Sequence, residues 1–511
     1  MRYLPSFFLV FICLFIQTYG QTIPLTIQQV DYSKSTELQQ GTYGVNNNTF
    51  SASYHIDHPS FLKAYRDLGS PTVRYPGGTV ANYINLKTGK AEAWEKASSK
   101  SKLRVKNLNS SIKRNGKRYG KDELNSFIVF AKQTGIKTTF VLNISSMSLK
   151  DTDYVFNKIA RSGIVLECVE MGNELYFGTY KEIVPDVASY LKLAKERTQL
   201  VKSYFPTAKI GLLLPSHVYT HESFLDEVVV ASDRQMLWYN ALQKEDFYDA
   251  LVLHLYSSNG MGRKTKRKDF LDYKQSYRYA ISHADGKFGT AIRTIEKDFP
   301  SKEVWLTEYH VGGFGGDVRS YRLRYAYLGA LFTANFMMKL LETPKITIGS
   351  WHSMVQMLRY PKKIGLQLDA DTPFQKTVNY HFFKAFKSPV QNASHYLKVA
   401  FNNQTNYKGL GDYTAQYSDL EAGVFIDAIS RNCQLIIFNK WEKPYSVNID
   451  NLSDNLKGLL TKITTIQPDV HLEYSKSLAS ETTFSKEVQD PTGTSLMLPP
   501  FSMTIVEFTR N

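Results

Sequence analysis

The sequence is poor in cysteine and has no long hydrophobic segment after its first twenty residues. Only three of the 511 residues are cysteine, and one of them, Cys13, lies within those twenty. A disulfide framework is therefore excluded. The chain also lacks a G-x-S-x-G elbow, a complete phosphate-loop pattern and a His-Glu-x-x-His motif. We therefore expect neither a bound metal nor a cofactor.

The first twenty residues have the pattern of a secretory signal peptide. Arg2 precedes the apolar run 7–16, and small residues at Thr18 and Gly20 suit cleavage after Gly20. A membrane anchor needs about 20 apolar residues, so we expect no membrane span. This pattern predicts a signal peptide over 1–20 and a secreted or periplasmic protein.

The region 41–385 alternates short β-branched runs with longer helical patterns. The expected helices are 59–69, 122–134, 152–162, 186–204, 234–246, 285–298 and 320–341. The expected strands are 42–45, 72–75, 137–142, 165–171, 209–214, 250–254, 303–307 and 345–350. Eight strands alternating with helices predict an α/β fold, a closed (β/α)8 TIM barrel. A doubly wound open sheet is the alternative.

The pattern of apolar and polar residues changes after about residue 385. Short alternating runs such as 422–426, 433–439 and 502–508 are separated by turns, which predicts an antiparallel β-sandwich over 386–511. Residues 22–30 alternate too, so we expect segment 21–40 to add a strand to this sandwich.

The positive charge is concentrated in two segments. Segment 96–121 has ten basic residues and no acidic one, and segment 263–268 has five more; the rest of the chain carries 47 basic and 47 acidic residues. In the predicted barrel both segments are strand-to-helix loops on the face where barrel active sites form. A basic rim there would attract an anionic substrate. Solvated loops that serve solubility are the alternative, and nucleic acid is not an expected partner.

Two glutamates stand at the ends of predicted barrel strands. Glu174 ends the run Val-Glu-Met-Gly-Asn-Glu after strand 4, and Glu308 ends Val-Trp-Leu-Thr-Glu after strand 7. Carboxylates at these positions face the mouth of the barrel. Glycoside hydrolysis needs two such groups, one to donate a proton and one to act as nucleophile or base.

Asn173-Glu174 and the strand-7 Glu308 resemble the catalytic motifs of clan A glycoside hydrolases. The segment Arg74-Tyr-Pro-Gly-Gly and the run 498–502 are similar to α-L-arabinofuranosidases and to the heparanase/β-glucuronidase group. This resemblance implies a retaining enzyme with a (β/α)8 catalytic domain. It also implies that Glu174 is the acid/base and Glu308 the nucleophile.

Six further residues are predicted to support the reaction or bind the sugar. We expect Asn173 to bind the sugar 2-hydroxyl and Arg74 to keep Glu308 ionised. We expect Tyr256 to donate a hydrogen bond to Glu308 and Trp351 to form a floor on which a sugar stacks. The other two, expected near the substrate, are His254 and His310.

The sequence therefore predicts a secreted retaining glycoside hydrolase that acts on a polysaccharide or oligosaccharide. The basic segments favour an acidic glycan, one with uronic acid or sulfate. Two alternatives stay open. One is an α-L-arabinofuranosidase or β-xylosidase acting on neutral glycans, and the other is a carbohydrate-binding protein without catalysis.

Overall fold

The computed structural model describes residues 23–28, 31–47, 54–94, 96–119, 122–215, 222–224, 227–229, 232–258, 273–312, 326–359, 374–407, 417–430, 432–452, 459–468, 485–489 and 495–509. The predicted signal peptide and the basic segment 263–268 lie outside these ranges. Among the helices described, none has the length and apolar character needed to cross a membrane.

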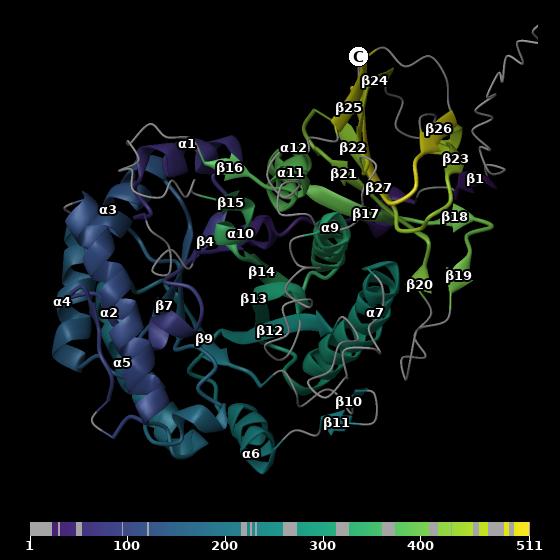
Figure 1. Ribbon diagram of the computed structural model, residues 1–511. Coiled ribbons are helices and arrows are strands. Elements are labelled where there is room, and N and C mark those ends of the chain that lie inside the picture. Colours follow the sequence, from purple (N-terminus) through teal and green to yellow (C-terminus); the bar gives the residue numbers. More distant parts are fainter. Residues whose placement is uncertain are drawn as a thin grey trace, which may run out of the picture.

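Eight parallel strands close into a barrel in the order β12-β13-β14-β3-β4-β7-β8-β9 (Figure 1). They are β3 (Gly44–Asn46), β4 (Thr72–Tyr75), β7 (Thr138–Leu142), β8 (Cys168–Met171), β9 (Lys209–Leu213), β12 (Ala250–Ser258), β13 (Glu303–Gly312) and β14 (Ile346–His352). The predicted (β/α)8 barrel is confirmed. Strands β12, β13 and β14 run further than predicted, so Tyr256, Glu308 and Trp351 lie inside strands rather than after them.

Helices surround the barrel and begin at recognisable caps. They are α1 (Pro59–Asp67), α2 (Ser99–Tyr119), α3 (Glu123–Thr134), α4 (Leu149–Arg161), α5 (Val187–Tyr204), α6 (Asp233–Leu242), α7 (Tyr273–Asp298) and α9 (Tyr327–Leu341). Four of them begin after a side chain that accepts a hydrogen bond from the backbone three residues later: Asp122, Ser148, Asp186 and Ser232. Such caps satisfy backbone N–H groups that the first turn leaves without partners.

The basic segment 96–121 is mostly helix, and its prediction as a loop was wrong. Val105, Leu108 and Ile112 recur at three- and four-residue spacing in α2 and pack against the core. That spacing forms one apolar stripe on a helix. The basic side chains that the structure describes in α2 are exposed: Lys100, Lys102, Arg104, Lys106 and Lys113. The charge of the segment concealed this helical pattern.

Shorter elements connect the barrel strands and lead to the second domain. They are η1 (Tyr32–Lys34), η2 (Gln40–Thr42), η4 (Thr79–Asn82), β5 (Ile84–Asn85), β6 (Lys90–Ala91), η5 (Gly178–Tyr180), β10 (Glu222–Phe224), β11 (Glu227–Val229), α10 (Met354–Met357), β15 (Leu358–Arg359), β16 (Gln375–Lys376), α11 (Val378–Ala385) and α12 (Lys387–Asn392). Two of these, η4 and η5, follow barrel strands β4 and β8 and lie beside the candidate site.

The C-terminal part forms a β-sandwich of two sheets. The larger sheet has the order β2-β17-β21-β22-β27-β24-β25 and the smaller one β18-β1-β23-β26, while β19 and β20 pair separately. The strands are β1 (Ile23–Ile27), β2 (Thr36–Glu37), β17 (His395–Val399), β18 (Phe401–Asn402), β19 (Asn406–Tyr407), β20 (Tyr417–Ser418), β21 (Leu420–Ile426), β22 (Cys433–Asn439), β23 (Tyr445–Asn448), β24 (Leu459–Ile466), β25 (Ser485–Gln489), β26 (Ser495–Leu498) and β27 (Ser502–Thr509). Strand β1 pairs with β18 and β23 and so belongs to the smaller sheet of the sandwich.

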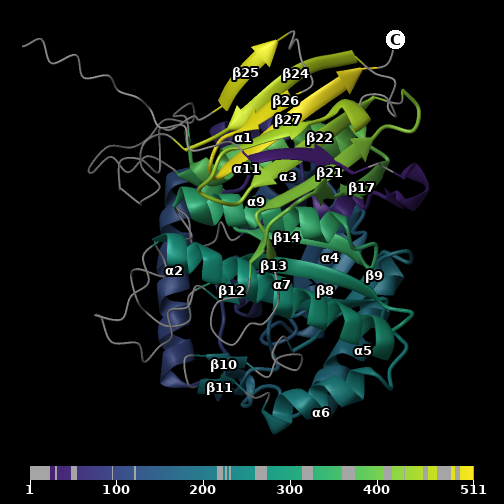
Figure 2. The same cartoon turned by 90° about the vertical axis from the view of Figure 1, so that its right-hand side faces the viewer.

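Helix α9 lies between the barrel and the sandwich (Figure 2). Every residue of α9 except Lys339 is buried, as expected for a helix that is apolar on all sides. Tyr327, at its start, donates hydrogen bonds to the sandwich carbonyls of Ile466 and Phe501. The helix therefore belongs to the cores of both domains.

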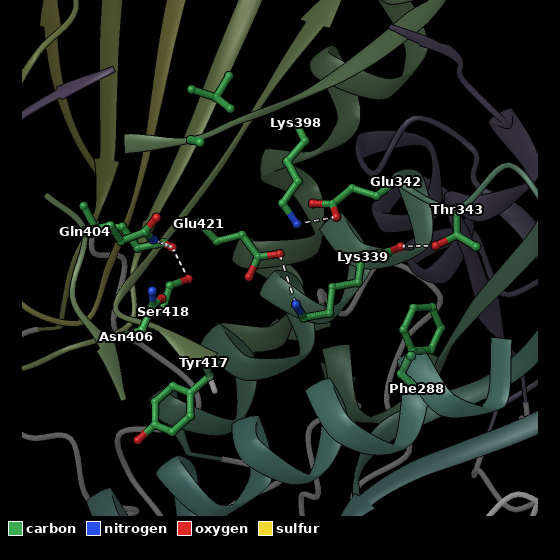
Figure 3. Close-up of a pocket in the computed structure, with 14 residues that line it drawn as sticks. Phe288, Lys339, Glu342, Thr343, Lys398, Gln404, Asn406, Tyr417, Ser418 and Glu421 are labelled. Atoms are coloured by element: carbon green, nitrogen blue, oxygen red, sulfur yellow. Dashed lines mark hydrogen bonds and ion pairs between the residues drawn. The ribbon is translucent and has the colours of Figure 1, made fainter. Parts of the chain in front are cut away.

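A polar pocket of about 390 Å³ opens at the same junction (Figure 3). Glu421 of β21 points toward Lys339 of α9, and their charged atoms are 3.3 Å apart. Beside them Lys398 pairs with Glu342 at 2.7 Å. Both pairs join the sandwich to the end of α9, so charge as well as apolar packing fixes the two domains together.

Candidate active site

The two predicted glutamates lie at the C-terminal ends of the barrel strands. Glu308 is part of β13, and Glu174 follows β8 by three residues. The side chain of Glu308 is 6% exposed, whereas that of Glu174 is 21% exposed. Glu174 has a φ of 50°, a left-handed conformation that is uncommon outside glycine. The chain after β8 thus turns sharply at the residue that carries the more accessible carboxylate.

Glu174, Glu308 and His254 form one cluster. Each provides an oxygen or nitrogen atom, and these atoms all lie within 4.8 Å of one another. Such a set has the donor chemistry to hold a cation, which the sequence did not lead us to expect. However, the Arg74 guanidinium already contacts Glu308 at 2.6 Å, and a second cation would be repelled.

Arg74, on β4, is fully buried and joins several polar side chains. Its Nη1 donates to Glu308 Oε1, and its Nη2 donates to Asn173 Oδ1 at 2.9 Å. Its Nε and Nη2 also contact the carboxylate of Glu170, at 2.8–3.1 Å. A buried cation is tolerable only with paired charges, and two carboxylates supply them here.

Glu308 is surrounded by donors and positive charges. Tyr256 donates a hydrogen bond to its Oε2 at 2.5 Å, as expected, and the Nδ1 of His352 lies 3.8 Å from the same oxygen. Burial alone would raise the pKa of Glu308, but the charges of His254, His352 and Arg74 and the Tyr256 hydrogen bond lower it well below its ordinary value. Glu308 is therefore ionised across the neutral and mildly acidic range.

His254 lies between the two carboxylates. Its Nδ1 is 3.0 Å from Glu174 Oε1 and 3.7 Å from Glu308 Oε2. The pairing of β12 with β13 places His254 directly opposite Glu308. Burial alone would lower the pKa of His254, but the charge of Glu308 and the hydrogen bond to Glu174 raise it. The imidazole is thus poised to carry a proton next to Glu174.

Asn173 is held rigidly by Asn82. The backbone N–H of Asn173 donates to Asn82 Oδ1 at 3.0 Å, and Asn82 Nδ2 donates to the Asn173 carbonyl at 2.7 Å. The side-chain oxygen of Asn173 is occupied by Arg74. Its Nδ2 is buried and has no partner within the described part of the chain. This donor remains available to a substrate hydroxyl.

Trp351 and His310 are near the site but buried. Trp351 is fully buried, and its ring packs against Phe383 and Tyr309. His310 is 1% exposed and meets the Trp351 ring edge-on at 6.1 Å. Neither ring offers an exposed face here, and their predicted roles in substrate binding stay predictions.

Glu170 and Asn82 belong to the site but were not predicted from the sequence. Glu170 lies four residues before Glu174, on a strand whose alternating side chains point into the barrel, and this alternation was the available signal. Asn82 belongs to η4, and nothing in its local sequence indicates that it holds Asn173. His352, whose Nδ1 lies 3.8 Å from Glu308 Oε2, also belongs to the site.

The basic helix α2 reaches the site through its first two turns. Lys100 and Arg104 line a pocket of about 150 Å³ together with Glu174. The part of the charge prediction that concerns segment 263–268 lies outside the described residues. Whether the positive charge selects an anionic substrate stays a prediction.

Comparison with known proteins gives a match through structure alone. No protein-family model matches the sequence, and no curated protein does. Among solved structures, AbfB, a family 51 α-L-arabinofuranosidase from Bifidobacterium longum, has a TM-score of 0.66 at 14% identity, covering 94% of this chain and 97% of AbfB. A GH51 arabinofuranosidase from Xanthomonas axonopodis pv. citri has a TM-score of 0.67 at 14% identity, covering 95% of this chain and 100% of that one.

A 4-O-α-L-rhamnosyl-β-D-glucuronidase from Fusarium oxysporum is more distant. Its TM-score is 0.55 at 11% identity, with 95% of this chain and 100% of that chain covered. Arabinofuranosidases and a glucuronidase are the kinds of enzyme that the sequence motifs resemble. At these identities the likeness shows that the chain shares their fold over nearly its whole length.

Proposed function

We propose that this chain is a retaining glycoside hydrolase in which Glu308 is the nucleophile and Glu174 the acid/base. The separation of the two carboxylates is the observation that carries the proposal. One oxygen of Glu174 and one of Glu308 lie within 4.8 Å of each other. Retaining enzymes hold these groups about 5–5.5 Å apart, whereas inverting enzymes leave about 6.5–9.5 Å for a water molecule.

The environments of the two glutamates support different roles. Glu308 is buried against Arg74 and accepts a hydrogen bond from Tyr256, which keeps it anionic and ready to attack the anomeric carbon. Glu174 is more exposed and contacts His254. In the first step Glu174 would protonate the departing oxygen, and in the second it would take a proton from water as that water releases the sugar from Glu308.

Asn173 supports the same reaction. Its buried Nδ2 has no partner among the described residues, and its position is fixed by Asn82 and Arg74. A donor fixed in this way can bind the sugar 2-hydroxyl without reorganising when charge develops on the ring. Hydrogen bonds to this hydroxyl strengthen in the transition state of glycoside hydrolysis.

The substrate of the proposed enzyme is an acidic polysaccharide or oligosaccharide, encountered outside the cytoplasm. Export rests on the signal-peptide pattern of residues 1–20. The acidic substrate rests on the basic helix α2 beside Glu174. A neutral arabinose-containing glycan is the second candidate, because AbfB and the Xanthomonas axonopodis enzyme are arabinofuranosidases.

The test is sugar release from a panel of acidic and neutral glycans by the wild type and by Glu308→Gln. We expect the wild type to release sugar from the acidic glycans and the variant to release none. NMR should show that the product first formed has the same anomeric configuration as the substrate. Release of sugar from arabinan or xylan alone would support the proposed mechanism and contradict the proposal of an acidic substrate. An inverted product would overturn the nucleophile, and glycan binding without release by either protein would indicate a carbohydrate-binding protein.

A further inference from the structure

A small pocket lies beside Glu174 at the barrel mouth. It is lined by the acid/base carboxylate together with residues of three segments: η4 with the residue after it (Thr79 and Tyr83), the first turns of α2, and η5 with the residue before it. Glu308 is not among its lining residues. The proton donor of a glycosidase stands beside the bond to the departing group. A pocket that is lined by Glu174 and not by Glu308 is therefore placed to receive that group.

Two cations of α2 line this pocket. Lys100 and Arg104 are four residues apart and so lie on one face of the helix. Both side chains are exposed. No acidic residue occurs in segment 96–121 to neutralise them. Their charge is thus available to a ligand.

Aromatic rings form another part of the pocket. Tyr83, Phe177 and Tyr180 contribute to its lining. Tyr83 stacks on Trp94 with ring centroids 5.6 Å apart, and the Arg104 guanidinium lies 5.9 Å from the Tyr83 ring centroid. Tyr83 and Tyr180 are buried, whereas Phe177 is partly exposed and offers apolar surface next to two charged groups. Apolar surface next to a few charged groups is the usual composition of a small-molecule site. A sugar ring that carries an anionic group matches both features.

The guanidinium of Arg74, beside Glu308, is already paired with protein side chains. Arg74 is fully buried and contacts Glu170, Glu308 and Asn173. Its charge is offset by the two carboxylates, so it cannot also pair with an acidic sugar without breaking these contacts. Among the described residues that line the pocket with Glu174, the cations are Lys100 and Arg104 of α2.

We propose that this pocket is the leaving-group subsite and that it binds a sugar unit carrying a carboxylate or a sulfate through Lys100 and Arg104. The proposal rests on the proposed glycosidase function and adds to it the position of the anionic group. The acidic unit lies on the leaving-group side of the bond that is cleaved, rather than in the sugar that becomes attached to Glu308.

Transfer to added acceptors tests this subsite separately from hydrolysis. A panel of 4-nitrophenyl glycosides first identifies a donor. The 4-nitrophenyl leaving group carries neither a carboxylate nor a sulfate. In the transfer step an acceptor hydroxyl oxygen attacks the anomeric carbon, the bond to Glu308 breaks and frees its carboxylate, and the hydroxyl proton passes to Glu174. Three acceptors are compared: methyl β-D-glucuronide, methyl β-D-glucoside 6-sulfate and neutral methyl β-D-glucoside.

We expect the wild type to form more transfer product, relative to hydrolysis, with an anionic acceptor than with the neutral one. The double variant Lys100→Gln/Arg104→Gln should lose this preference by about tenfold, as removal of charge-assisted contacts predicts. Added salt should weaken the preference in the wild type. A preference for the glucuronide alone would assign the subsite to a uronic acid, and one for the sulfate alone to a sulfate ester.

The matched control is Lys102→Gln/Lys106→Gln, which removes the same charge from the same helix. These two lysines are exposed and do not line the pocket. The control variant should keep the wild-type preference. Equal transfer to all three acceptors, or a preference that survives in the Lys100/Arg104 variant, would overturn the subsite while hydrolysis of the donor upheld the glycosidase. If no donor in the panel were hydrolysed, the proposed function would be overturned, and the subsite with it.

Discussion

Two buried charge networks of this molecule use similar groups in different surroundings. At the barrel mouth, Arg74 contacts Glu308 and Glu170. At the domain junction, Glu421 contacts Lys339 at 3.3 Å (Figure 3). Glu421 also contacts Lys440 at 3.0 Å and the Asn335 amide at 2.9 Å. One network has a cation between carboxylates, and the other has a carboxylate between cations.

The networks differ in what they leave available. At the barrel mouth the Asn173 amide retains a donor without a partner among the described residues, and Glu174 is partly exposed beside the ion pairs. At the junction the carboxylate of Glu421 is surrounded by its two lysines and Asn335. Burial alone would raise the pKa of Glu421, but Lys339 and Lys440 lower it well below its ordinary value. A hydrogen-bond donor without a partner, next to a fixed charge, suits binding and chemistry. A carboxylate whose charge is fully paired suits the joining of two domains.

The largest expected effect is the loss of activity in Glu308→Gln. Removal of the nucleophile should lower kcat by about 10⁴-fold or more. The fold should survive, because Arg74 keeps its contacts with Glu170. Turnover of the best donor glycoside, with circular dichroism as a check of folding, measures both. Near-wild-type turnover would exclude Glu308 from the chemistry.

Glu174→Gln should have a smaller effect that depends on the leaving group. Loss of a general acid costs about 10²–10⁴-fold. The loss should be greatest for substrates whose leaving oxygen needs a proton and smallest for nitrophenyl glycosides, since nitrophenolate departs without one. Comparing kcat/KM for an alkyl and a nitrophenyl glycoside measures this. The same loss for both would argue against a role in protonation.

Glu421→Gln should affect stability rather than chemistry. Removing one partner of a buried ion pair costs about 3–5 kcal/mol, because Lys440 is left buried without the carboxylate that it contacts. Denaturant unfolding of this variant and of Glu308→Gln, side by side, tests the contrast between the networks. If Glu421→Gln and Glu308→Gln lowered the free energy of unfolding equally, the contrast between the two networks would not hold.

The same residue predicts how stability varies with pH. The pKa of Glu421 in the folded protein is below its ordinary value of 4.5. Its contribution is therefore present above the unfolded-state pKa and is lost as the pH falls through the folded-state pKa. Wild-type stability should decline on acidification below about pH 4.5 more steeply than that of Glu421→Gln, in unfolding curves recorded across this range.

Tyr256→Phe should have the smallest effect and should act through pH. Loss of the hydrogen bond to Glu308 removes one of the interactions that lower the pKa of this carboxyl. The acidic limb of the kcat/KM profile should move upward by about one pH unit. Tyr309→Phe is the control, because that buried ring lies on the same strand as Glu308 and packs against Phe336 and Trp351. An unmoved limb in Tyr256→Phe would show that Glu308 does not set it.

The barrel and the sandwich could be predicted because both follow from local patterns. Alternating β-branched runs and helical stretches marked all eight barrel strands, and the short runs after 385 marked the sandwich. Helix α2 was not predicted, because its segment was assigned to the strand-to-helix loop after the second barrel strand. Val105, Leu108 and Ile112 nevertheless have helical spacing. The ends of β12 and β13 were missed because the polar residues His254 and Glu308 resemble strand ends. In the barrel they are strand residues, since the polar mouth tolerates them.

The sequence by itself determined which residues reach the barrel mouth, because the position of a residue on a parallel strand fixes the end of the barrel at which it lies. It thereby selected Glu174, Glu308 and Arg74 as candidates. Only the tertiary structure decided how they contact one another. Arg74 divides its charge between Glu308 and Glu170, and Asn82 fixes Asn173 from another loop. These contacts join residues far apart in the chain, and their distances depend on barrel closure and side-chain packing, which no local pattern records.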